Sequence, residues 1–192
     1  MLRTVVSSFC LVLLLSFPGH AQSEFVPANN PRYDVDATAL DIRIDDNPPQ
    51  TYPSVGHLAA VPYDQAFKIW AERRFKLTGN SVNSLRVTLT EGRITEQVLS
   101  IKKGIKGWFK KEPATEYSAS LVIGVAIIGP EGTVIASTDA KSWHTTSLVE
   151  GATPVEKDAA LNNLVSETFA ALDREIAPQF ERHLGKYARP SN

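Results

Sequence analysis

Three histidines lie beyond residue 21, and histidine is the side chain best suited to acid–base or metal chemistry near neutral pH. They are His57, His144 and His183. We expect them on a loop, a strand and a helix end, and no two of them have the short spacing of a metal-binding pair. The sequence therefore predicts no metal site built on histidine.

Ser142, His144 and Asp139 supply the residue types of a nucleophile, a base and an orienting acid. On an extended strand, residues two apart share a face, so Ser142 and His144 would point to one side and Asp139 to the other. We therefore predict no catalytic residues and a protein that is not an enzyme. An unrecognised hydrolase is the alternative, and it would lose turnover when His144 or His57 is replaced.

Aspartates gather early in the chain, and carboxylate oxygens are ligands that Ca²⁺ prefers. The five are Asp34, Asp36, Asp41, Asp45 and Asp46. Their spacing matches no calcium loop, and we expect Asp41 and Asp45 on the solvent side of a strand. Gly104 and Gly107 do not follow the fingerprint of a phosphate-binding loop either. We predict no metal and no cofactor.

The most unusual stretch is residues 101–111, which holds five of the chain's ten lysines around two large aromatic residues. Wound as a helix, its apolar residues fall on one stripe and most lysines occupy the rest of the circumference. This pattern is typical of an element that binds a protein partner or a membrane surface. The candidate binding residues are Ile101, Lys102, Lys103, Ile105, Lys106, Trp108, Phe109, Lys110 and Lys111.

Three interpretations of residues 101–111 stay open. Two glycines and the short length disfavour a helix that is stable alone in water, so we expect a mobile loop that orders against a surface. That surface is an envelope protein, with Trp108 as the hot spot, or an anionic membrane, to which each lysine contributes about 1 kcal/mol. In the third interpretation, the segment is a folded hairpin tip whose lysines protect the sheet edge.

The first 21 residues have the pattern of a secretory signal peptide. Arg3 precedes an apolar run over residues 4–17, and Gly19 and Ala21 fit a cleavage site near Ala21. The run is too short to span a membrane comfortably, and it contains Cys10, the only cysteine of the chain. Export without disulfides is typical of the Gram-negative periplasm, where we expect the protein.

Charges are nearly balanced along the chain, with 20 basic and 21 acidic residues. Removal of the signal peptide takes away Arg3 and leaves a formal charge of −2. A nucleic-acid-binding domain usually presents a strongly basic face, so we predict no nucleic-acid partner. About 170 remaining residues are enough for one domain with a sizeable core.

Alternating apolar residues predict four strands, over residues 37–45, 84–99, 116–129 and 133–145. The third is apolar on both faces, which predicts a central strand covered on both sides. Gly129-Pro130-Glu131-Gly132 predicts a hairpin turn.

Helical spacing predicts two helices. The first covers residues 62–78. The second begins with a capping box at Thr153-Pro154-Val155-Glu156 and extends to Leu184, with a kink or break at Pro178. Trp70 and Trp143 are expected in the core.

The order strand, helix, three strands, helix predicts an α+β two-layer sandwich. We expect a mostly antiparallel sheet with both helices on one face, over residues 37–187. Residues 22–36 would form a flexible lead, and residues 188–192 a disordered tail.

The element order, with LRVTL at Leu85–Leu89, YSASLVIGVAII from Tyr117 and the late helix from Pro154, resembles the small periplasmic auxiliary lipoproteins of Gram-negative envelope systems. These include the proteins accompanying ABC-type lipid transporters, and exported families of similar layout share the order. The resemblance covers residues 37–184. Those lipoproteins carry a lipidated cysteine directly after the signal, where this chain has Gln22. The resemblance implies a non-catalytic accessory of assembly or transport.

We therefore expect a non-catalytic periplasmic accessory protein that binds an envelope partner through residues 101–111, at a membrane surface or away from one. The alternative is a carrier of a small ligand or lipid in a groove between the sheet and the helices.

Overall fold

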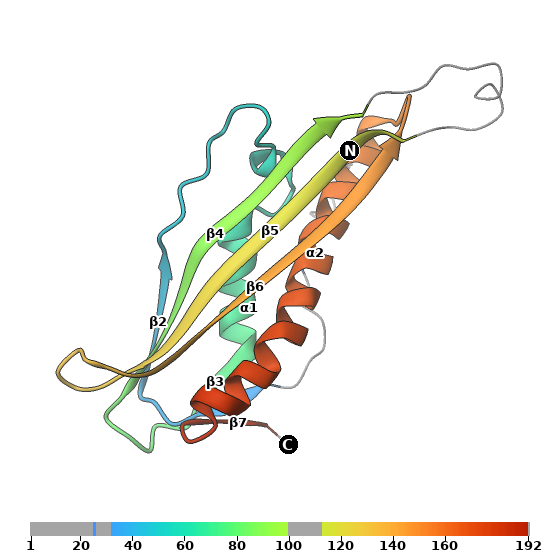
Figure 1. The fold of residues 1–192 in the computed structure, drawn as a ribbon. Helices are drawn as coiled ribbons and strands as arrows, with labels where there is room; N and C mark the ends of the chain where they lie inside the picture. Colours follow the sequence, from blue (N-terminus) through green and yellow to red (C-terminus); the bar gives the residue numbers. More distant parts are fainter. Residues whose placement is uncertain (1–24, 26–31, 100–112, 192) are drawn as a thin grey trace, which may run out of the picture.

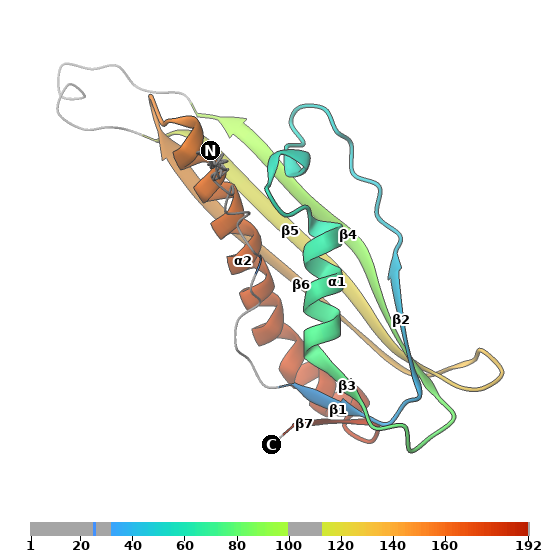
Figure 2. The same ribbon diagram turned by 180° about the vertical axis from the view of Figure 1, so that it is seen from behind.

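The structure is a computed structural model that describes residue 25 and residues 32–99 and 113–191. Its main body is a four-stranded sheet with two α-helices packed on one face (Figures 1 and 2). The α+β two-layer sandwich is therefore confirmed, and so is the expected order of its six main elements.

The sheet has the strand order β2-β4-β5-β6. Its strands are β2 (Ala39–Ile44), β4 (Ser84–Val98), β5 (Pro113–Ile128) and β6 (Val134–Val149). The three long strands are antiparallel to one another in the order β4-β5-β6, whereas β2 is parallel to β4. A bulge interrupts the β4–β5 register between Leu89 and Glu91. The sheet is thus mostly antiparallel, with β5 between two long partners.

The helix layer consists of α1 (Tyr63–Arg74) and α2 (Pro154–Gln179). The capping box at the start of α2 is confirmed, because Thr153 accepts a hydrogen bond from the Glu156 amide and the Glu156 carboxylate accepts one from the Thr153 amide. Pro178 lies inside α2, and the helical path continues through a π-helical turn at Phe180–Leu184. Proline therefore changes the hydrogen-bonding pattern here without ending the helix.

The core lies between the helices and the inner face of the sheet. In β5, Leu121 and Ile123 are fully buried on that face, whereas Val122 and Gly124 are half-exposed on the other. The central place of β5 was predicted correctly, but the expected cover on both faces was wrong because both helices pack on one side. Large side chains from the two layers fill the space between them: Phe67, Trp70, Leu85, Leu89, Leu161, Leu164, Phe169 and Phe180.

Trp70 belongs to this core, as predicted, whereas the core placement of Trp143 was wrong. Trp143 is 71% exposed on the outer face. The buried β6 side chains beneath α2, Thr138, Ala140 and Ser142, are small, and the Ser142 hydroxyl donates to the Thr168 carbonyl of α2 over 2.9 Å. Because α2 lies this close to β6, no large side chain fits beneath it, and the alternation of the strand turns Trp143 outward.

A second sheet closes one end of the molecule, with the order β3-β1-β7. Its strands are β1 (Tyr33–Val35), β3 (Phe75–Leu77) and β7 (Ala188–Pro190). The first helix therefore ends at Arg74 instead of residue 78, and the expected lead and tail each contribute a strand to the fold. Three-residue strands are too short to show periodicity, and their partners are distant in sequence.

Phe25 also departs from the expected flexible lead. Its ring is buried against Phe169 of α2, with ring centroids 5.2 Å apart. The packed core thus extends to a residue only a few positions beyond the predicted cleavage site.

Candidate interaction surface

The candidate binding residues at 101–111 lie outside the residues that the structure describes. Their flanks are described, and they meet at the end of the β4–β5 hairpin. The Leu99 amide donates to the Ala114 carbonyl over 2.8 Å. Residues 101–111, which we name the Lys/Trp segment, therefore lie in the sequence between two strand ends that the sheet holds together.

Exposed valines gather at this end of the molecule. Val98 at the end of β4 is 67% exposed, and Val155 at the start of α2 is 76% exposed. Val149, at the end of β6, is paired with Pro113 of β5 and is also exposed. Clustered exposed apolar residues mark interaction sites more often than scattered ones do. We name Val98, Val149 and Val155 the valine rim.

Polar contacts hold the strands and α2 in place below the valine rim. The Lys157 ammonium lies 3.3 Å from the Glu96 carboxylate and 5.6 Å from the centre of the Tyr117 ring. Partial burial acts against the lysine charge, but contacts with Tyr117 and Glu96 outweigh it and raise the pKa of Lys157. α2 is thereby joined to both β4 and β5 at this end.

The three residue types of a catalytic triad in β6 do not meet, as the strand argument predicted. Ser142 is buried against α2, and His144 lies on the same inner face, whereas Asp139 is exposed on the outer face. The geometry of β6 thus agrees with the strand argument for these three residues. That the protein is not an enzyme stays a prediction.

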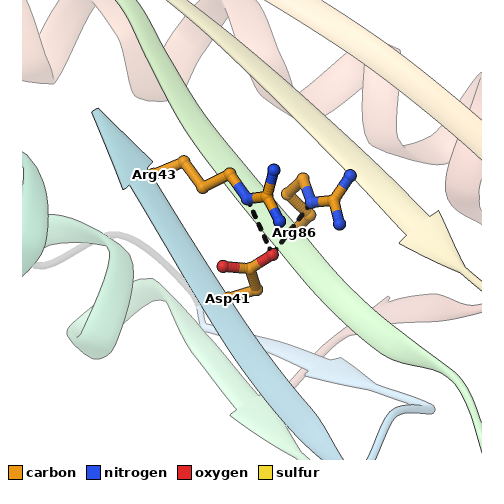
Figure 3. A network of polar contacts seen from close by, with 3 residues as sticks. All are labelled: Asp41, Arg43 and Arg86. Carbon is orange, nitrogen blue, oxygen red and sulfur yellow. Dashed lines mark hydrogen bonds and ion pairs between the residues drawn. The ribbon is translucent and has the colours of Figure 1, made fainter. Parts of the chain in front are cut away.

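The early aspartates also have separate structural partners. Asp41 of β2 accepts hydrogen bonds from Arg86 and Arg43, each over 2.9 Å (Figure 3). The Arg86 contact, helped by Arg43, lowers the pKa of Asp41 against a smaller effect of burial. Asp46 instead accepts from the Gly92 amide over 2.6 Å. Within the described part of the chain, no group of three or more His, Cys, Asp or Glu residues is placed to hold a metal.

Sequence reasoning missed the outer face of the sheet and its β6 edge. No described helix covers this face (Figure 1). Trp143 projects from its last strand, which pairs with β5 on one side and with no described strand on the other. The signal was present in β6 as an alternation of small residues with charged and aromatic ones, but its apolar face was too weak to orient the strand.

A cavity of about 420 Å³ lies where the β2–α1 connection leaves the sheet. Its walls come from that connection, the start of α1 and β4, and they include Asp46, Asn47, His57, Asp64 and Leu89. The sequence offered no pattern for this cavity, because loop residues far from β4 along the chain form most of it.

A buried polar contact joins α1 to α2. The Asp173 carboxylate accepts from the Trp70 indole nitrogen over 2.8 Å and forms an ion pair with Arg74. Both charged side chains are almost fully buried. This contact ties the two helices to each other beside the small sheet.

Neither described helix combines the length and the apolar composition that a membrane span requires.

Comparison with family models and with curated protein sequences finds no match. Among solved structures, the chain is similar to a minor lipoprotein from Acinetobacter baumannii, with 14% identity, a TM-score of 0.38, and coverage of 76% of this chain and 92% of that one. It is also similar to the rare lipoprotein B from Shewanella oneidensis, with 17% identity, a TM-score of 0.37, and coverage of 76% and 96%. Likeness at this level assigns no role to this chain.

Proposed function

We propose that this protein is a non-catalytic periplasmic accessory protein that binds an envelope partner through the end of the molecule that carries residues 101–111. The observation that carries the proposal is the valine rim, whose exposed residues lie at the ends of β4 and β6 and at the start of α2, at the same end of the molecule as the flanks of the Lys/Trp segment. The exposed valines, together with the five lysines in the sequence of residues 101–111, suit a surface that combines apolar and acidic groups. The proposed export rests on the signal-peptide pattern of the first 21 residues.

The described residues at this end of the molecule support docking as an already folded surface. The contact of Lys157 with Glu96 and Tyr117 fixes α2 against the sheet, so the described part of this surface needs no ordering on binding. A small ordering cost leaves more of the contact energy for affinity. Trp108 is the expected hot spot, because tryptophan is enriched among residues whose truncation costs 2 kcal/mol or more.

Photocrosslinking tests this function. Trp108 is replaced by p-benzoylphenylalanine in the full chain in its native host, and adducts are identified by mass spectrometry. Val82 is the matched control, because it is 74% exposed in the β3–β4 connection, at the opposite end of β4. We expect a discrete protein adduct from position 108 and none from position 82.

Lipid adducts in the same experiment would distinguish a membrane surface from a protein partner. Phospholipid adducts from position 108 would favour docking on a membrane over docking on a protein. Intramolecular adducts alone, in a folded and exported protein, would contradict the proposal and favour a folded hairpin tip. The same adducts from both positions would also contradict it.

The cavity favours a second candidate function, a carrier of a small ligand. Its volume of about 420 Å³ lies within the range of ligand pockets, and its walls mix carboxylates with apolar side chains. Native mass spectrometry of the purified protein should then show a bound small molecule. Asn47→Trp, which fills the cavity, should remove that mass, and Val82→Trp should retain it. Absence of any bound molecule from the unaltered protein would contradict this candidate.

A further inference from the structure

The long edge strand of the main sheet has one side along which no described strand pairs with its backbone. β6 has 16 residues and pairs with β5 along nearly all of them. On its other side no described strand is present. Its outer face carries Trp143, 71% exposed, between the exposed residues Lys141 and Thr145.

The pairing of β4 with β5 indicates which β6 residues point their backbone to the open side. The Val122 and Ser118 carbonyls of β5 accept from threonine hydroxyls of β4, so even-numbered β5 residues direct their backbone groups toward β4. Odd-numbered β5 residues then bond to β6, where their partners are even-numbered, as in Leu121 opposite Ser142.

No described strand lies beside the open-side backbone groups of the odd-numbered β6 residues, and these residues can therefore bond with a further strand. They include Asp139, Lys141, Trp143 and Thr145, whose side chains lie on the outer face. Unpaired N–H and C=O groups in a row are the chemical complement of one kind of ligand, an extended polypeptide.

Devices that usually protect a sheet edge are scarce along β6. The strand contains no proline and no glycine, and its register with β5 shifts only at the two ends. Its acidic and basic residues, Asp139 and Lys141, are of opposite sign and nearly adjacent, so they add no net charge against a second strand. Natural proteins usually block such an edge unless it serves pairing.

A second copy of this chain does not fit the edge in antiparallel pairing. The hydrogen bond from Ser142 to Thr168 places α2 directly over β6. Strands lie about 4.8 Å apart, whereas helix axes need about 8–10 Å. Two copies joined in this way would bring both α2 helices to one face of the joined sheet at less than that separation. The fitting occupant is a single extended segment with no helix of its own on this face.

The side chains of the outer face describe that segment further. In antiparallel register, a basic residue would lie opposite Asp139 and an acidic one opposite Lys141. Trp143 would pair with an aromatic or β-branched residue, because such cross-strand pairs are stabilising.

We propose that the open edge of β6 binds an extended segment of a partner protein by strand addition, with Trp143 as its side-chain anchor. This inference rests on the proposed function and names the second surface by which the protein holds its partner. The pairing supplies backbone hydrogen bonds through the odd-numbered residues, and the Asp139/Lys141 pattern sets the register.

The test places p-benzoylphenylalanine at position 143 of the full chain in its native host. Thr145→Pro removes an amide on the open side, and Thr145→Val keeps that amide. We expect adducts that map to one extended stretch of one protein, unchanged by Thr145→Val and reduced at least about tenfold by Thr145→Pro, because proline cannot donate to a ladder. Circular dichroism confirms that each variant is folded.

A second pair of variants keeps the inference testable if Thr145→Pro does not fold. Lys141→Glu places two like charges on the edge and should reduce the adduct several-fold, whereas Lys141→Arg should preserve it. Adducts that ignore all these changes, adducts to a second copy, phospholipid adducts alone or no adduct at all would each overturn the inference. A protein adduct from position 108 with none from 143 removes this inference alone. Failure at both positions removes the proposed function as well.

Discussion

The two edges of the main sheet are treated in opposite ways. The β2 edge is short, six residues long, and the chain beyond it carries Pro48, Pro49 and Pro53 before it returns to pair Ser54 with Thr95 of β4. The β6 edge is 16 residues long and has no described neighbour on its open side.

The side chains along the two edges also differ. On the β2 side, one carboxylate, Asp41, holds the guanidinium groups of Arg43 and Arg86 across the first two strands. On the β6 side, Trp143 stands exposed between polar neighbours. Short strands and prolines are common means of preventing edge pairing. The β2 edge is therefore protected against strand pairing, whereas the β6 edge is left available.

Both edges belong to a sheet that packs on the helix layer. The buried contact of Asp173 with Arg74 and Trp70 holds the two helices of this layer together. Asp173→Ala leaves a buried guanidinium without this carboxylate and should lower the free energy of unfolding by about 3–5 kcal/mol. Urea denaturation followed by circular dichroism measures the loss. The double variant Arg74→Met with Asp173→Leu should recover most of it. A loss below about 1 kcal/mol for Asp173→Ala would show that other contacts hold the helices.

Two proline substitutions distinguish the paired side of the β6 backbone from its open side. Ser142→Pro removes an amide that faces β5 and the hydroxyl bonded to Thr168, and should lower the free energy of unfolding by about 2–4 kcal/mol. Thr145→Pro removes an amide on the open side and should change it by about 1 kcal/mol or less. Thermal and urea unfolding compare the two. Equal losses would contradict the assignment of odd-numbered residues to the open edge.

The smallest expected effect concerns the protected edge. Asp41 is about one-third exposed, so Asp41→Asn should lower the free energy of unfolding by less than about 1 kcal/mol near neutral pH. Because the folded-state pKa is lowered, this contribution is present above the ordinary aspartate value of 3.8 and disappears as pH falls through the folded-state pKa. Urea unfolding of both proteins across acidic pH checks this. A difference that grows on acidification would contradict the sign.

Local signals predicted the main elements well. The capping box at Thr153 and the stripe of α2 are encoded within a few residues, as is the alternation along β5. The small sheet β3-β1-β7 could not be predicted, because its strands are short and pair across most of the chain.

The prediction of which β6 side chains are buried failed for a different reason. Its buried positions, Thr138, Ala140 and Ser142, are small or polar because α2 lies close above them, so the strand has no strong apolar face. The prediction that Trp143 lies in the core was therefore wrong. The open edge depends on strand order, which no single stretch of sequence specifies. Residues 101–111 lie outside the described residues, and their role stays a prediction.

Amide hydrogen exchange by NMR on the isolated protein tests the open edge most directly. The amides of Asp139, Lys141 and Trp143 should exchange at rates close to those of an unfolded peptide, because no described residue accepts their hydrogen bonds. Those of Ala140 and Ser142 should be strongly protected by their bonds to β5. Uniform protection along β6 would show that the edge is already paired, and it would contradict the claim that β6 is kept open for a partner.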